Sequence, residues 1–184
     1  MMKALLVGDS GTGKTAYMDR VVSGEFGNPT VTIGVNVCEY NVRLSGKPSV
    51  CIQFWDCGGG FNELHKSYYQ GAKGAIVMFD VHDPTSFQNV PTWIRKIREH
   101  CGSIPIVVCG NKIDLLDRQV SVQECKELAR QEKYFDLSVR SCYNWEKPLL
   151  WLAQEYLETI GEPSFSSTGS DVPPTSKLCP ICAK

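Results

Sequence analysis

The sequence predicts an α/β fold with a six-stranded, mostly parallel sheet and helices on both faces. Short apolar segments alternate along the chain with amphipathic segments of helical period. Strands that are apolar on both sides need cover on both faces of the sheet, and crossover helices supply that cover. Two neighbouring strand segments are separated only by the turn SGKP (45–48), so they form a hairpin and make the sheet mixed.

Each element follows from its local pattern. Short runs rich in apolar residues mark the strands, which we expect at residues 3–7, 35–44, 49–55, 74–81, 104–110 and 134–138. Longer amphipathic runs mark the helices, which we expect at residues 16–24, 85–101, 121–132 and 146–160. Ser121 and Glu124 have the spacing of a capping box, which supports a helix start at that point.

Composition places this fold in a single domain with a tail. The chain has 184 residues, 42% hydrophobic and 21% charged, which is typical of one globular domain. The domain is expected at 1–161, and the Ser-, Thr- and Pro-rich segment 162–184 is expected to be a flexible tail. A net charge of -1 supplies no basic field for nucleic acid or anionic lipid. We expect a monomer.

Cysteine use and the chain ends bear on location. Nine cysteines in a chain with a full core indicate reduced thiols, so we expect the nucleus and cytoplasm. No secretory signal or membrane-spanning run is evident, and Ile181 stands where prenylation would need a cysteine, so we expect no stable membrane anchor. Cys179 and Cys182 leave three alternatives open, namely free thiols, palmitoylation and half of a zinc site.

A glycine-rich turn from Gly8 to Thr15 matches the pattern G-x-x-x-x-G-K-[ST]. Its glycines let the backbone aim N–H groups inward, and the following helix N-terminus favours a polyphosphate there. In this pattern Lys14 supplies a charge for the β- and γ-phosphates, and Thr15 an oxygen for Mg²⁺. The alternative is a chance glycine-rich turn, but the turn lies between an apolar strand and a helix, as the motif requires.

A second motif, Asn111-Lys112-x-Asp114, ends the strand at 104–110, where open α/β sheets bind ligands. The Asp114 carboxylate can accept hydrogen bonds from both N1–H and N2–H₂ of guanine. Adenine lacks that pair of donors and would leave the carboxylate unpaired, so a site of this kind discriminates steeply. The alternative is an exposed turn, in which Asn and Asp are common residues.

Five motifs occur in the order in which the small Ras-like GTPases carry them, and the sequence resembles that superfamily over residues 3–161. The motifs are GDSGTGKT, a threonine in TVTIG, WDCGG, NKID and SVR. The segments FDV, NVPTWIRKIREHCGSIPIVVCGNKID and YNWEKPLLWLA are most similar to the Ran family. The resemblance implies the P-loop GTPase fold and a switch between GTP and GDP. It also implies importin-β-type transport receptors and a nucleotide-exchange factor as partners.

The resemblance also implies roles for individual residues. Thr32 is similar to the threonine that meets Mg²⁺ and the γ-phosphate in the GTP state. Asp56 is similar to the residue that holds Mg²⁺ through a water, and Gly59 to the glycine whose N–H contacts the γ-phosphate. Phe26 stands where the family places an aromatic ring across guanine. Ser138 and Val139 match the loop whose backbone N–H meets the guanine oxygen, and Arg140 replaces its usual lysine.

The resulting set of predicted site residues falls into three groups. The nucleotide-binding residues are Asp9, Ser10, Gly11, Thr12, Gly13, Lys14, Thr15, Ala16, Phe26, Thr32, Gly59, Asn111, Lys112, Asp114, Ser138, Val139 and Arg140. The catalytic residues are Lys14, Thr32, Gly59 and Gly60, and the metal-binding residues are Thr15, Thr32 and Asp56.

The sequence departs from the family where hydrolysis is controlled. The family pattern after the aspartate of the second switch is Thr-Ala-Gly-Gln, whereas residues 57–60 here are Cys-Gly-Gly-Gly, in a segment about two residues short. The water-orienting glutamine is therefore replaced by Gly60 or lost, and Asn62, Glu63 or His65 is the alternative polar group. The first switch is about one residue short. The tail lacks the acidic run of the Ran family, and Ser10 is more similar to the Rab family.

Three functions follow as hypotheses, and whether the chain hydrolyses GTP stays open among them. The first is a Ran-like switch in nucleocytoplasmic transport with slow hydrolysis. The second is a GTP-bound scaffold that hydrolyses almost nothing and sequesters effectors. The third is a Rab-like trafficking GTPase.

Overall fold

The computed structural model describes residues 1–26, 34–58 and 66–161, and its centre is one six-stranded sheet. The strand order is β2-β3-β1-β4-β5-β6. All neighbouring pairs are parallel except β2 and β3, which form the predicted hairpin. The strands are β1 (Met2–Val7), β2 (Val35–Val42), β3 (Val50–Cys57), β4 (Gly74–Asp80), β5 (Ile106–Asn111) and β6 (Lys133–Asp136). The predicted fold class is confirmed.

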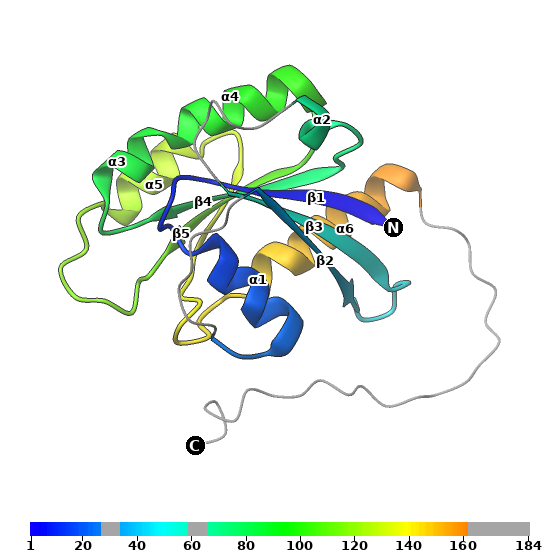
Figure 1. Cartoon of the computed structure of the whole chain (residues 1–184), viewed down its shortest axis with the longest axis horizontal. Helices are drawn as coiled ribbons and strands as arrows, with labels where there is room; N and C mark the ends of the chain where they lie inside the picture. Colours follow the sequence, from blue (N-terminus) through cyan, green and yellow to red (C-terminus); the bar gives the residue numbers. More distant parts are fainter. Residues whose placement is uncertain (27–33, 59–65, 162–184) are drawn as a thin grey trace.

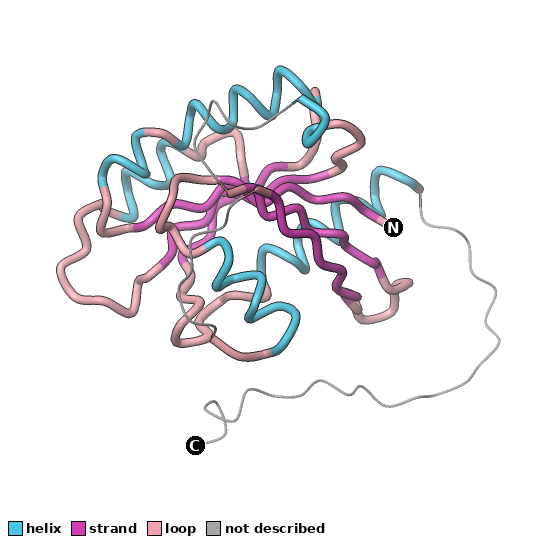
Figure 2. The backbone as a smooth tube through the Cα atoms, in the orientation of Figure 1, coloured by secondary structure: helices cyan, strands magenta, loops and turns pink. Residues whose placement is uncertain are grey.

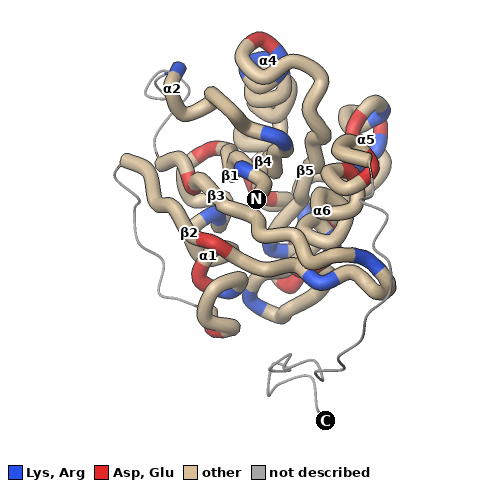
Figure 3. Tube along the Cα trace, turned by 90° about the vertical axis from the view of Figure 1, so that its right-hand side faces the viewer, with Lys and Arg blue, Asp and Glu red and all other residues tan. Residues whose placement is uncertain are grey.

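Helices cover both faces of the sheet, as Figures 1 and 2 show. They are α1 (Lys14–Ser23), α2 (Lys66–Tyr69), α3 (Pro84–Gln88), α4 (Val90–Cys101), α5 (Val122–Leu128) and α6 (Lys147–Ile160). Alternation along β1 separates two cores: Ala4 and Leu6 pack with α1 and α6, whereas Leu5 and Val7 pack with α2, α4 and α5. Figure 3 shows charges of both signs interspersed along the chain.

The carboxyl ends of the strands meet at one edge of the sheet. The pairing sets Leu6 opposite Asp56, Asp80 opposite Asn111 and Gly110 opposite Asp136. The turn after β1 and the ends of β3, β4 and β5 are therefore neighbours, although they are far apart in the sequence. This edge is where open α/β sheets bind ligands, and it collects the predicted polar residues.

Several expected boundaries differ from the structure. The single helix expected at 85–101 is two helices that meet at Asn89, whose N–H bonds to Phe87 O and Thr85 O. Pro91 has no N–H to give to Phe87 O, so one continuous ladder of helical bonds is broken there. The short α2 was not expected. The helix expected at 121–132 ends at Leu128, although Ser121 and Glu124 do form the predicted capping box.

Two further findings concern the ends of the fold. Helix α6 ends at Ile160, one residue before the described part ends. The predictions for the tail, including those for Cys179 and Cys182, fall outside the described residues. Within the described part of the chain, no helix is both long and apolar enough to cross a membrane.

Candidate nucleotide-binding site

The turn between β1 and α1 has the backbone that the glycine pattern predicts. Gly8, Gly11 and Gly13 have φ of 143°, 78° and 99°, a region that other residues rarely adopt. A Cβ atom on Gly8 would lie 2.0 Å from Met78 O, and one on Gly13 would lie 2.3 Å from Asn111 Nδ2. Glycine is thus required both for the turn and for its close approach to β4 and β5.

Lys14 spans this turn from the first position of α1. Its side chain is buried, and Nζ donates to Gly8 O and Asp9 O, each at 2.8 Å. Burial lowers the pKa of Lys14, and the nearby carboxylates of Asp56 and Asp9 oppose that shift. An anion in the turn would stabilise the charged ammonium further, so the site chemically favours a phosphate.

Thr15 and Asp56 meet on the other side of the turn. Thr15 Oγ1 donates to Asp56 Oδ2 at 2.8 Å, and Asp56 is fully buried at the end of β3. A hydroxyl and a carboxylate side by side form the hard-oxygen donor set that Mg²⁺ prefers, with phosphate oxygens and waters completing its octahedron. The two residues therefore fit the metal role predicted for them.

The side chain of Asn111 ties three loops together. Its Nδ2 donates to Thr12 O at 2.9 Å, which holds the phosphate turn. Its Oδ1 accepts from the N–H groups of Lys112 at 2.8 Å and Val139 at 3.2 Å. Asn111 is buried, and each of these bonds satisfies a backbone group that is not paired within a helix or a strand.

Asp114 is held at the mouth of a cavity by Ser138, whose hydroxyl donates to Asp114 Oδ1 at 2.5 Å. The cavity has a volume of about 190 Å³. Its lining residues are Gly11, Gly13, Ala16, Phe26, Asn111, Lys112, Asp114, Leu115, Val139 and Arg140. A planar ring in this cavity would have apolar contacts from Phe26 and Leu115 and a carboxylate at its edge. That arrangement matches a guanine base, whose N1–H and N2–H₂ need one acceptor group.

Ser138 lies in the loop to which the resemblance assigns the guanine oxygen. Its backbone N–H donates to Tyr143 O at 3.0 Å, so that group is already engaged within the loop. Its hydroxyl, besides orienting Asp114, accepts from Ser141 N–H at 2.9 Å. Ser138 therefore acts on the cavity through its side chain, and the N–H of Val139 in the same loop donates to Asn111 Oδ1.

The Asp9 carboxylate anchors the phosphate turn to the helices. Its Oδ2 accepts from Asn89 Nδ2 at 2.6 Å and its Oδ1 from Trp93 Nε1 at 2.9 Å. Trp93 is buried, so this contact joins the turn to the core under α4. Sequence reasoning placed Asp9 in the site but missed Asn89 and Trp93, because only the folded chain brings them to the turn.

Two further anchors were also missed. Arg20 is buried on α1 and donates from Nε to Val139 O at 3.3 Å and from Nη1 to Gly24 O at 2.7 Å. Arg118 follows the Asn-Lys-x-Asp motif and donates from Nη1 to Asp136 Oδ2 at 3.0 Å. Arg20 holds a loop that lines the cavity, whereas Arg118 ties the segment after the motif to the end of β6, and nothing in the sequence pattern distinguishes these two from surface arginines.

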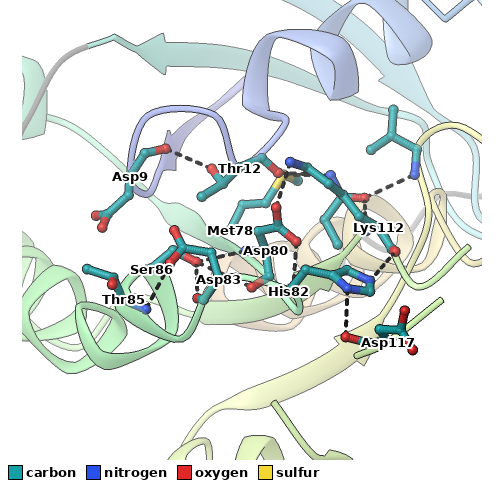
Figure 4. A network of polar contacts seen from close by, with 12 residues as sticks. Asp9, Thr12, Met78, Asp80, His82, Asp83, Thr85, Ser86, Lys112 and Asp117 are labelled. Atoms are coloured by element: carbon teal, nitrogen blue, oxygen red, sulfur yellow. Dashed lines mark hydrogen bonds and ion pairs between the residues drawn. The ribbon is translucent and has the colours of Figure 1, made fainter. Parts of the chain in front are cut away.

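Lys112 adds a further contact to the site, on the side of β4. It has φ of 71°, and its Nζ pairs with Asp80 Oδ2 at 2.6 Å, as Figure 4 shows. The pair fixes the backbone of the motif between Asn111 and Asp114. The ring of His82 lies beside it and faces the carbonyl groups of Lys112 and Asp117.

In the second switch, the residue that follows Asp56 is Cys57. Its thiol is buried, and burial raises its pKa to about 12, with the Asp56 carboxylate acting in the same direction. The reactive thiolate of Cys57 is therefore scarce at neutral pH. The predicted residues Thr32, Gly59 and Gly60, and the alternatives Asn62, Glu63 and His65, lie outside the described residues.

The turn, the buried lysine and the carboxylate-edged cavity together define a nucleotide-binding α/β protein of the P-loop type. A model of the Ras family matches residues 3–158 of the chain. The chain therefore belongs to the Ras family of small GTP-binding switch proteins. Members of this family bind GTP and GDP, generally with Mg²⁺.

The Asp9 anchor gives a first testable prediction. Asn89→Ala removes a hydrogen bond to a carboxylate, a kind of bond that contributes about 1.5–3 kcal/mol. We expect the free energy of unfolding to fall by about 1–2 kcal/mol, because Asn89 is half-buried. Urea unfolding measures the change, with the exposed neighbour substitution Gln88→Ala as control. Equal stabilities of the two variants would show that the anchor contributes nothing.

Proposed function

We propose that the protein is a guanine-nucleotide-dependent switch that binds GTP and GDP tightly and hydrolyses GTP slowly. One observation carries the proposal: Ser138 fixes the Asp114 carboxylate at the edge of a cavity that Phe26 also lines. The Ser138 hydroxyl lies 2.5 Å from Asp114 Oδ1, and no ion pair of Asp114 is found among the described residues 1–26, 34–58 and 66–161. A guanine edge supplies the two donors that such an acceptor requires.

The remaining residues take roles around the phosphates. The N–H groups of the glycine-rich turn and Lys14 bind the phosphate oxygens, and Asp9 holds the turn in shape. Thr15 would hold Mg²⁺ with its hydroxyl and Asp56 would hold it through a water, and the ion would supply positive charge next to the phosphates. Asn111 keeps the phosphate turn and the base loops at a fixed separation. Together these contacts bind the nucleotide without committing it to hydrolysis.

Slow hydrolysis follows from the residues after Asp56. Phosphoryl transfer requires little covalent chemistry, but it does require a water held in line with the γ-phosphate. The sequence Cys57-Gly58-Gly59-Gly60 contains no side chain that orients water. Losing such a group typically costs on the order of 10²–10⁴ in rate, or about 3–5 kcal/mol of barrier. The glycines also make the loop lose more entropy when it orders around the phosphate.

The Ran-like partnership is the finer part of the proposal. It is motivated by two segments, NVPTWIRKIREH (89–100) and YNWEKPLLWLA (143–153), and each has buried and exposed side chains. In the first, Trp93 and Ile97 are buried while Arg95 is exposed; in the second, Leu149 is buried while Leu150 is exposed. The exposed sides are the surface that an importin-β-type receptor would contact. On this proposal the protein acts in nucleocytoplasmic transport, in nucleus and cytoplasm. The second candidate is a GTP-bound scaffold for the same partners, favoured by the glycine run.

Base selection is the first test of the proposal. Asp114→Asn replaces one of the two acceptor oxygens with a donor, which suits the carbonyl at C2 of xanthine. We expect GTP affinity to fall about a hundredfold or more and affinity for xanthosine triphosphate to rise. Competition against a fluorescent GDP analogue measures both. Asp117→Asn, three residues along the same loop, is the matched control. If ATP competes as well as GTP in the unmodified protein, the base assignment is wrong.

Hydrolysis is the second test. We expect single-turnover GTP hydrolysis to be very slow and to respond little to a Ran-type activating protein. Gly60→Gln should raise the rate if the missing side chain is the cause, and no rise would assign the slowness to the shortened loop. Rapid, strongly stimulated hydrolysis by the unmodified protein would contradict the proposal and point to Asn62, Glu63 or His65 as the water-orienting group.

A further inference from the structure

We propose that His82 is a proton-dependent positioning residue for the base cavity, closing the loop Lys112–Asp117 when its ring carries two protons. The inference rests on the proposed function, because the loop it controls carries Asp114. His82 follows β4 and belongs to none of the motifs from which the site was predicted. Figure 4 shows its ring between the two ends of that loop.

The contacts of the ring have an unusual symmetry. Nδ1 lies 3.2 Å from Asp117 O, and Nε2 lies 3.3 Å from Lys112 O. A neutral imidazole has one N–H donor, so it can bond to only one of these two carbonyl groups. Its other nitrogen would then point a lone pair at a carbonyl oxygen, which is repulsive. The imidazolium form donates to both, so protonation adds a second bond and removes the repulsion.

The two carbonyl groups belong to strained positions. Lys112 has φ of 71° and Asp117 has φ of 64°, and both are in the left-handed region that residues other than glycine rarely adopt. These conformations turn the chain at each end of the loop and direct both carbonyl groups to the histidine. A bond to each carbonyl therefore stabilises the turned shape at both ends.

The segment between these ends needs such support. Leu115 and Leu116 are exposed, and the former lines the cavity beside Asp114. The Leu115 N–H donates to Lys112 O at 3.0 Å, and the side-chain amide of Gln119 donates to Asp117 O at 2.8 Å. Each carbonyl oxygen therefore has its second lone pair left for the histidine ring. Fixing both ends holds Asp114 where Ser138 meets it. Releasing one end lets the carboxylate move away from the base.

The groups around His82 come from three segments. Asp80 at the end of β4 accepts from the backbone N–H of His82 at 2.9 Å and pairs with the Lys112 ammonium. Asp83 caps α3 through Thr85 N–H, and the Asp117 side chain is exposed. Histidine ordinarily changes charge between about pH 5 and 8, whereas carboxyl and ammonium groups ordinarily do so outside that range. Among the groups named here, the imidazole is therefore the type of side chain that a pH change between about 6 and 8 addresses.

The test is the release rate of a fluorescent GDP analogue chased with unlabelled GDP. We expect the unmodified protein to release it about tenfold more slowly at about pH 6 than at about pH 8, a difference of ~1.4 kcal/mol. His82→Gln keeps one donor at every pH, so its rate should be nearly constant and close to the fast rate. His100→Gln, on the far part of α4, is the matched control and should keep the full pH dependence. A flat profile in the unmodified protein, or parallel profiles in His82→Gln, overturns the proposal.

A second measurement separates this inference from the proposed function. If the unmodified protein bound no guanine nucleotide at either pH, the proposed function would fail. Hydrogen exchange at the Leu115 amide, corrected for intrinsic rates, would then decide the inference without any nucleotide. Greater protection at the lower pH, absent from His82→Gln, supports it, and equal protection at both pH values overturns it. The comparison within the unmodified protein holds even if His82→Gln fails to fold.

Discussion

The site depends most on the hydrogen bonds of one buried side chain, Asn111. Its amide bonds to the carbonyl of Thr12 and to the N–H groups of Lys112 and Val139, so it fixes the distance between the loop that receives phosphates and the loops that receive the base. A nucleotide consists of a rigid base joined to charged phosphates, so its pocket must hold the base site and the phosphate site at a fixed separation. Gly13 has no Cβ where Asn111 approaches, so the turn and the asparagine form one unit.

The contacts on the base side of this unit differ from those on its phosphate side. On the base side, side chains tie three of the described segments: Arg20 bonds to Val139, Ser138 bonds to Asp114, and Arg118 holds the segment after Asp114. On the phosphate side, Thr15 and Asp56 meet where Mg²⁺ would lie, but the chain then continues into glycines. On the proposed function, the base side binds the nucleotide and the residues after Asp56 set the rate of hydrolysis. This asymmetry is the physical basis for proposing a switch that holds its nucleotide for long periods.

The sequence predicted the fold well because apolar strands and amphipathic helices leave strong periodic signals, and it predicted Lys14, Asn111 and Asp114 because motif spacing is local. It missed Trp93, Asn89 and Arg20, which reach the site from other elements and carry no local pattern. It merged α3 and α4 because their apolar period runs through Asn89, and only the missing N–H of Pro91 separates them. It also could not show that the Ser138 N–H bonds to Tyr143 O, because spacing does not reveal such a contact.

The central claim is that this cavity selects a guanine nucleotide. Its most direct test is to denature the freshly purified protein and identify the released nucleotide by ion-exchange chromatography. The arrangement of Asp114, Phe26 and Asn111 predicts GDP or GTP in nearly equimolar amount with the protein. Release of an adenine nucleotide, or of no nucleotide from folded protein that also fails to bind added GDP with Mg²⁺, would contradict the claim.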